Sequence, residues 1–304
     1  MTTCRAAPLF APWMGVILAC CSGLLTAGCL HDWDDWLPAS AIGGSGGSTS
    51  GTGGSSTSST GTGGSSSSGG GSVPGSCPSS NGITALVKVA TLAGTAQCIE
   101  ATEVTRGQYE TWLNEGSVPS GLPVACGFNV EYAPVSDWPP GGVGLDRPVA
   151  HVDWCDAQAY CLDHNRRLCA KIGGGSLSPS AFNDPSESEW FNACTHRGER
   201  VFPYGEIYEP TACNGTHQGL NSTADVASLS GCVDASGDVF DLSGNVWEWE
   251  DSCSTEAGTD DTCHIRGGGY NNGESNMNCG TNATANRGGT AINVGFRCCA
   301  DPQG

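Results

Sequence analysis

The sequence predicts an α+β domain that is irregular and rich in disulfide bonds. Three segments between residues 105 and 198 have helical character, but the strand candidates are short. They are separated by glycines and prolines, of which the chain has 46 and 16. Fourteen cysteines lie between Cys77 and Cys299. In an exported domain, such a high and even number indicates a framework of up to seven disulfide bonds.

Residues 1–29 predict a lipoprotein signal peptide. Arg5 precedes an apolar run at residues 13–18, which is too short for a membrane span but fits a secretory signal. The run leads to LTAGC at residues 25–29, which resembles a bacterial lipoprotein cleavage site. We therefore expect cleavage before Cys29 and lipidation of its thiol, with a plain signal peptide as the alternative. Because Leu30 and not an aspartate follows, we expect the outer membrane or cell surface.

Residues 30–76 predict a disordered tether. Residues 43–72 consist only of Gly, Ser and Thr, which cannot bury enough apolar surface to fold. A flexible coil of this length has a root-mean-square span of roughly 30 Å. The tether would hold the domain at residues 77–304 away from the membrane.

The charge of residues 77–304 argues against nucleic acid as a partner. This part of the chain holds 28 acidic and 11 basic residues, a net charge of −17 with histidine neutral, and no basic stripe. An acidic surface suits calcium, cationic ligands or simply solubility, and solubility is the default interpretation.

Helices are expected at residues 105–116, 153–165 and 186–198. Thr105 and Ser186 each begin a capping-box pattern, with Gln or Glu three residues later. Aromatic residues recur on each segment at helical spacing, and we expect them to belong to the core.

The clearest strand candidates are residues 83–90 and 294–299. The second contains the adjacent cysteines Cys298 and Cys299, whose side chains would point to opposite faces of a strand. They should therefore bond two different partners, and Cys279 is a candidate for one of them.

Two further statements about pairing follow from spacing. Cys155 and Cys161 lie on one expected helix, about 9 Å apart along its axis and on different faces, so they should not bond each other. A bond between Cys253 and Cys263 would close a short acidic loop.

Several motifs, read in order, carry a resemblance to a known family. They are TEVTRGQY (102–109), RPVAHVDWCDAQAYC (147–161), RRLCAKIGGG (166–175), SEWFNACTHRG (188–198), FPYGE (202–206), DLSGNVWEWEDSC (241–253), IRGGGY (265–270) and NVGFRCC (293–299). Together they resemble the formylglycine-generating enzymes, or sulfatase-modifying factors, over nearly all of residues 83–300. The resemblance implies the C-type-lectin-like fold of that family.

The resemblance also implies calcium. Carried over by position, the ligands would be the side chains of Asp241 and Glu248 with the carbonyls of Gly244 and Val246. Carboxylate and carbonyl oxygens suit a hard cation. The alternative is a capped acidic turn without metal. A second site is implied at Asn214 and the carbonyl of Gly215, but its acidic partner is not evident.

The family's copper chemistry transfers poorly. Its enzymes hold copper(I) with two thiolates, two and seven residues after the aromatic residue of the Arg-Gly-Gly-x-aromatic motif. Counted from Tyr270, these positions are Asn272 and Met277, which cannot supply thiolates. Cys279 stands two residues too late, and the sequence favours a structural disulfide role for it. We therefore do not expect copper.

Two functions remain open at this point. The first is a non-catalytic binding module for a glycan or peptide, in which the Asn-rich loop 270–290 would present amides to the ligand. The alternative for that loop is that it merely turns easily. The second function is a formylglycine-generating oxidoreductase that acts on a sulfatase cysteine with rearranged copper ligands.

Overall fold

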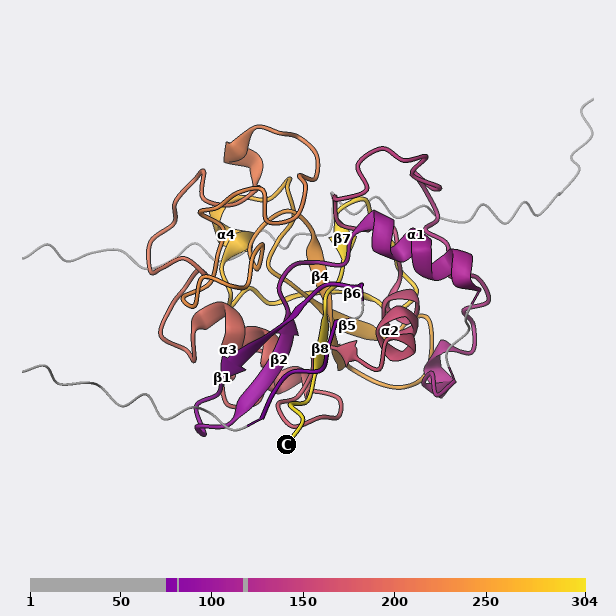
Figure 1. Cartoon of the computed structure of the whole chain (residues 1–304), viewed down its shortest axis with the longest axis horizontal. Helices are drawn as coiled ribbons and strands as arrows, with labels where there is room; N and C mark the ends of the chain where they lie inside the picture. The colour runs from indigo at the N-terminus through magenta and orange to yellow at the C-terminus, as the bar shows by residue number, and fades with distance from the viewer. Residues whose placement is uncertain (1–74, 81, 117–119) are drawn as a thin grey trace, which may run out of the picture. The chain divides into compact units, whose positions relative to one another are not determined.

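The computed structural model describes residues 75–80, 82–116 and 120–304 (Figure 1). The expected signal peptide, Cys29 and all but the end of the tether lie outside these residues and stay predictions. Ser76, at that end, already pairs with Gln303: each backbone N–H donates to the other's carbonyl. No helix in the described part is long and apolar enough to cross a bilayer.

Two four-stranded sheets form the framework, so the predicted α+β class is confirmed. The first sheet has the order β1-β2-β8-β3 and is antiparallel throughout. The second has the order β6-β5-β4-β7, and its β4/β7 pair is parallel. The strands are β1 Leu86–Ala90, β2 Ala96–Glu100, β3 Arg167–Leu168, β4 Trp247–Cys253, β5 Thr262–Arg266, β6 Ala283–Asn286, β7 Val294–Gly295 and β8 Cys298–Ala300.

Four short helices accompany the sheets. They are α1 Arg106–Glu115, α2 Trp154–Asp163, α3 Glu189–Thr195 and α4 Glu274–Met277. Among the described residues, single 3-10 turns lie at Val124–Cys126, Pro179–Ala181 and Thr216–Gln218. In the sequence, α2 is followed by β3, and α3 precedes β4. We call β4 the signature strand because it contains WEWEDSC, the end of the motif at residues 241–253. In space α2 packs beside β3 and α3 beside β2.

The first two helices begin as their capping residues predict. Thr105 and Gln108 form a reciprocal capping box at α1, and Gly116 ends that helix in the left-handed conformation. Asp153 caps α2. The expected start of the third helix at Ser186 is wrong, because Ser186 donates its N–H and hydroxyl to Asp184 Oδ1 in a local turn. Ser188 caps α3 instead.

The expected strand at residues 294–299 is split between the two sheets. Residues 294–295 form β7 and residues 298–300 form β8, with Phe296 and Arg297 between them. The Phe296 carbonyl accepts the Val104 N–H, and both intervening side chains are fully buried. This crossing places Arg297 in the interior between the sheets, where it reaches the signature strand.

The aromatic residues of the first two helices do form core, as expected. The Tyr109 ring lies 5.0 Å from that of Trp112, and both lie within 5.6 Å of the Tyr160 ring, measured between centroids. Phe296 completes the cluster, 5.5 Å from Tyr160. These contacts fix α1 against α2 and so hold the start of α1 in place.

Seven disulfide bonds join all fourteen cysteines of this region. The pairs are Cys77–Cys98, Cys126–Cys155, Cys161–Cys298, Cys169–Cys299, Cys194–Cys279, Cys213–Cys232 and Cys253–Cys263. Cys298 and Cys299 bond different partners, and Cys253 bonds Cys263. The suggestion that Cys279 pairs with one of the adjacent cysteines is wrong, since its partner is Cys194 on α3.

Candidate functional site

The loop that precedes β4 brings together the residues of both expected calcium sites. It turns through positive φ angles at Asp241, Gly244 and Asn245. A Cβ atom on Gly244 would lie 2.3 Å from the Asn214 carbonyl oxygen, so no larger residue fits there. The Asn245 N–H donates to the same oxygen at 2.8 Å. Gly244 therefore lets the loop before β4 pack directly on residues 214–215.

Glu248, at the start of β4, is held in a buried ion pair. Arg297 donates from Nε to its Oε2 at 2.6 Å and from Nη2 to its Oε1 at 2.7 Å, and Trp190 Nε1–H donates to Oε2 at 2.8 Å. The two charged side chains are each only 1% exposed. Although burial opposes its charge, the neighbouring Glu248 raises the pKa of Arg297. This bidentate pair links the two sheets.

Two more acids lie in the same interior. Glu103 is fully buried, and neither of its carboxylate oxygens has a hydrogen-bond partner among the described residues. Burial, and then the charge of Asp241, raises the pKa of Glu103. Asp241 accepts the Ala227 N–H at 2.6 Å, and burial raises the pKa of Asp241 to about 6. Glu248, Glu103 and Asp241 all interact electrostatically with the buried Arg297 guanidinium.

The contacts of Glu248 and Asp241 determine which of their oxygens could bind calcium at the expected first site. Oε2 of Glu248 already accepts two donors, which leaves Oε1 and the free Oδ1 of Asp241 as the carboxylate positions able to bind a cation. Within the described ranges, no three His, Cys, Asp or Glu side chains are grouped to hold a metal. A cation here would therefore also need the carbonyls of Gly244 and Val246. The donor chemistry and the excess negative charge fit a hard cation.

Asn214, from the expected second calcium site, uses its side-chain amide in hydrogen bonds within the protein. Its Nδ2 donates to the Ser222 carbonyl and to Asn245 Oδ1, both at 3.0 Å. Its Oδ1 is buried without a partner, and the Gly215 carbonyl accepts the Gln218 N–H. The Asn245 amide oxygen also accepts the Ala224 N–H at 2.8 Å, so Asn214 and Asn245 belong to one hydrogen-bonded cluster.

The positions expected for copper ligands hold no thiol. Asn272 Oδ1 accepts the Gly269 N–H at 2.9 Å, so this amide closes its own turn. Met277 is buried against the Cys213–Cys232 disulfide bond. Cys279 is bonded to Cys194. Every cysteine in the described part of the chain is in fact bridged, so none of them is available as a thiolate.

Four of the six asparagine amides in loop 270–290, that of Asn272 included, make contacts within the protein. The Asn271 oxygen accepts from Asn293 Nδ2 at 2.8 Å, Asn278 Nδ2 donates to the Ser275 carbonyl at 2.8 Å, and Asn282 Oδ1 lies 3.1 Å from His264 Nε2. These contacts favour the alternative that the loop is Asn-rich because it turns repeatedly.

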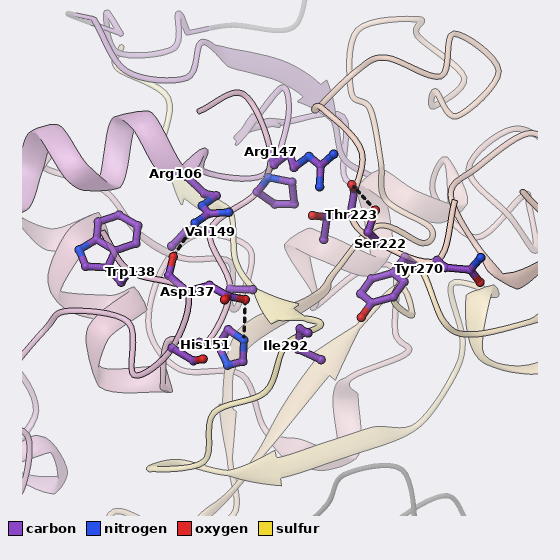
Figure 2. A pocket seen from close by; sticks show the side chains of 14 residues that line it. Arg106, Asp137, Trp138, Arg147, Val149, His151, Ser222, Thr223, Tyr270 and Ile292 are labelled. Carbon is purple, nitrogen blue, oxygen red and sulfur yellow. Dashed lines mark hydrogen bonds and ion pairs between the residues drawn. The ribbon is translucent and has the colours of Figure 1, made fainter. Parts of the chain in front are cut away.

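A pocket of about 170 Å³ lies between the start of α1 and the loops around it (Figure 2). It is lined by Arg106, residues 136–138, residues 147–151, residues 221–223, Tyr270 and Ile292. Sequence analysis missed this pocket, although Tyr270 is the aromatic residue from which the copper positions were counted. Its other lining residues come from separate loops, and no spacing in the sequence joins them.

Backbone hydrogen bonds hold the two sides of the pocket together. The Arg106 N–H donates to the Arg147 carbonyl at 2.8 Å, and the His151 N–H donates to the Ala291 carbonyl at 2.9 Å. Asp137 and His151 both have positive φ angles, 55° and 61°, which are uncommon for residues with a side chain. The pocket is therefore built on a fixed backbone, parts of which adopt unusual conformations.

The charged groups of the pocket have neutral or distant partners. Arg106 Nη2 donates to the Asp137 carbonyl at 2.5 Å. Arg147 Nε lies 3.9 Å from Asp225 Oδ1, and both side chains are largely exposed. His151 Nε2 lies 3.8 Å from Asp137 Oδ2, and burial lowers the pKa of His151, so the imidazole is neutral at pH 7.

Comparison with known proteins identifies the domain. Residues 74–302 match the model of the family described as the sulfatase-modifying factor enzyme 1-like domain. The chain is 31% identical over 169 residues to "Inactive C-alpha-formylglycine-generating enzyme 2" of Mus musculus, covering 51% of this chain and 49% of that protein. It is 28% identical over 187 residues to "Formylglycine-generating enzyme" of Mus musculus, covering 51% and 45%.

The chain thus spans about half the length of the curated relatives it matches. Among solved structures, PvdO from Pseudomonas aeruginosa is similar, with 19% identity, a TM-score of 0.48, and coverage of 72% of this chain and 92% of that one.

Proposed function

The chain belongs to the family of sulfatase-modifying factors, and we propose that this member is an exported, lipid-anchored protein whose domain binds a ligand and does not form formylglycine. The observation that carries this proposal is the disulfide bond between Cys194 and Cys279. It engages the cysteine that stands nearest to the family's copper positions.

The chemistry of copper supports this proposal. Copper(I) binds soft thiolate ligands, and the matching positions here hold the amide of Asn272 and the thioether of Met277. Met277 is buried, and the Asn272 amide is occupied by its own turn. Among its relatives are proteins named as inactive as well as proteins named as enzymes. The fold alone does not carry the activity without its ligands.

The proposed location combines the disulfide bonds with the leader. Seven disulfide bonds fit an exported protein, because such bonds persist in oxidising compartments. The LTAGC sequence at residues 25–29 supports a lipid on Cys29. Metabolic labelling with a fatty acid should mark the wild-type chain and leave a Cys29→Ala variant unmarked. Labelling of the variant would contradict the anchor.

We further propose that calcium binds at the loop of residues 241–248. Asp241 would supply its carboxylate, Gly244 and Val246 their carbonyls, and Glu248 its Oε1. The support is the excess of buried carboxyl groups around Arg297. Calcium should raise the melting temperature of the purified protein relative to a chelator, and Asp241→Asn should remove most of that rise. An unchanged melting temperature in the wild type would contradict the site.

The test of the main proposal is a direct assay for aldehyde formation. The purified chain, with its disulfide bonds intact and copper(I) supplied, is incubated in air with a sulfatase-derived cysteine peptide, and an active formylglycine-generating enzyme serves as the control. We expect no aldehyde from this chain, and non-reducing peptide mapping should recover the Cys194–Cys279 pair. Aldehyde formation would overturn the proposal in favour of an oxidoreductase with rearranged ligands.

A further inference from the structure

We propose that the pocket at Arg106, Arg147 and Tyr270 binds a sugar that carries a carboxylate, such as a uronate, with the two guanidinium groups holding the acid. This inference deepens the proposed function and rests on it, since it names the ligand class of a binding module. The charge, lining and size of the pocket support this ligand class, and Figure 2 shows the lining side chains.

The pocket is rich in positive charge compared with the domain around it. Residues 77–304 carry a net charge of −17, yet two of their 11 basic residues line this one small pocket. Other arginines of the domain, such as Arg166 and Arg297, are buried and bonded to carboxylates. The lining also contains one carboxylate, Asp137, but the two arginines outnumber it, so the pocket favours anions over cations in a protein that is otherwise strongly acidic.

Neither of these two arginines makes a short bond to a carboxylate within the described residues. Arg106 is bonded to a backbone carbonyl, which leaves its positive charge without a bonded carboxylate. The acidic neighbour of Arg147 lies at 3.9 Å, beyond hydrogen-bond distance, and their side chains are 42% and 58% exposed. A guanidinium presents a planar fork of N–H donors that matches a carboxylate. Both groups can therefore accept a ligand acid without breaking a strong internal pair.

The rest of the pocket lining combines polar groups with some apolar surface. Hydroxyl groups come from Ser136, Ser222, Thr223 and Tyr270, and an amide comes from Asn221. Hydroxyls and amides both donate and accept hydrogen bonds, as the hydroxyl groups of a sugar require. The ring of Trp138 and the side chain of Ile292 add apolar surface suited to the C–H face of a sugar ring. Neutral His151 and its neighbour Asp137 complete the polar edge.

The volume of the pocket limits the size of its ligand. The pocket holds about 170 Å³, which is below the roughly 300–1,000 Å³ of sites for drug-sized molecules. It therefore suits a single sugar unit better than several residues of an extended peptide. An acidic peptide is the competing ligand, and the experiment below includes it.

The experiment measures binding by calorimetry at low salt. The full chain is titrated with a short oligosaccharide that contains glucuronate, with the matched neutral glucose oligosaccharide, and with an Asp/Glu-rich peptide. We expect the glucuronate ligand to bind at least tenfold more tightly than either of the others, and its affinity to fall as salt is added. Equal binding of the neutral sugar, stronger binding of the peptide, or no binding of the uronate would overturn the inference.

Variants locate the site. Arg147→Ala should weaken uronate binding at least tenfold, and Arg147→Lys, which keeps the charge but loses the fork, should weaken it less. Lys171→Ala removes one surface charge whose partner is Glu187, away from the pocket, and should leave affinity unchanged. Denaturation curves confirm that each variant folds. Unchanged affinity in Arg147→Ala, or an equal loss in Lys171→Ala, would overturn the assignment.

The two proposals can fail separately. If the chain neither binds the uronate nor forms aldehyde, only the ligand assignment is overturned. If it forms aldehyde from the sulfatase-derived peptide, the proposed function is overturned whatever the pocket binds.

Discussion

Arg297 and Arg147 place the same guanidinium group in two opposite settings. Arg297 is buried between the sheets and makes two short bonds to Glu248, besides donating to the carbonyls of Glu100 and Phe240. Arg147 lies at the pocket with 42% of its side chain exposed, and its acidic neighbour is 3.9 Å away. Arg297 uses four of its five N–H donors on internal partners. The side chain of Arg147, among the described residues, has only the 3.9 Å contact with Asp225.

This difference distinguishes the scaffold from the proposed binding pocket. A buried charge must be paired, because desolvation would otherwise cost several kcal/mol. A half-exposed charge is stabilised by water and can exchange water for a ligand at little cost. Residues that matter for recognition should therefore be dispensable for stability, and the residues around Arg297 should behave in the reverse way. The four predictions below test this contrast.

The largest effect is expected at the buried pair. Arg297→Ala leaves Glu248 without its partner, beside two other buried acids, and should lower the free energy of unfolding by about 3–5 kcal/mol. The measurement is urea denaturation with the disulfide bonds intact. The double variant Arg297→Met with Glu248→Leu should recover part of the loss, because no unpaired charge from the pair remains. A loss below about 1 kcal/mol in Arg297→Ala would mean that this centre is not structural.

The next largest effect is expected from the Cys194–Cys279 bond. This bond closes a loop with a sequence separation of 85, so replacing both cysteines by alanine should cost roughly 2–4 kcal/mol. The same denaturation assay measures the loss. Cys194→Ala alone should expose one titratable thiol at Cys279 in the unfolded protein, whereas the wild type should show none from this pair. A thiol at Cys279 in the unreduced wild type would contradict the pairing.

Buried carboxyl groups should also make stability depend on pH. Burial raises the pKa of Glu100 to about 7, above its usual value of 4.5, despite the opposing charge of Arg166. The folded state therefore binds the proton more tightly than the unfolded state. The resulting stabilisation is fully present below pH 4.5 and is lost as the pH rises through about 7.

Glu100→Gln should accordingly reduce the fall in unfolding free energy between pH 4.5 and 7.5. It should not abolish that fall, because burial raises the pKa of Glu189 to about 7 as well. Denaturation curves at a series of pH values give the two slopes. Since Glu100→Gln also weakens the bond to Arg166, the change in slope is the readout and not the absolute stability. An unchanged slope would contradict the assignment.

The sequence predicts the local parts of this molecule well and their assembly poorly. The capping box at Thr105 and the opposite directions of Cys298 and Cys299 follow from local geometry, and both are confirmed. The partner of Cys279 lies 85 residues away, and cysteine spacing does not select among the many ways to pair fourteen cysteines. The start of α3 was misplaced because Asp184 competes for Ser186.

The proposed binding pocket shows the same limit of sequence-based prediction. The Asn-rich loop has the composition of a ligand surface, but four of its six asparagine amides contact the loop or its neighbours. The pocket, by contrast, draws Arg106, Tyr270 and Ile292 from segments that have no common spacing. Tertiary contacts between distant segments, such as the bonds from the Arg106 N–H to the Arg147 carbonyl and from the His151 N–H to the Ala291 carbonyl, bring the sides of the pocket together. The proposed calcium site depends on contacts of the same kind and stays a prediction.

The smallest effect on stability is expected at the pocket itself. Arg147→Ala removes a side chain whose acidic neighbour is distant and exposed, while its backbone bonds to Gly144 and Arg106 remain. Exposed pairs of this kind contribute roughly 0–1 kcal/mol, so the unfolding free energy should change by no more than about 0.5 kcal/mol. Lys171→Ala, which removes a comparable surface pair, is the matched control. A loss of about 2 kcal/mol or more in Arg147→Ala alone would make Arg147 part of the scaffold, and the contrast with Arg297 would then no longer separate structure from recognition.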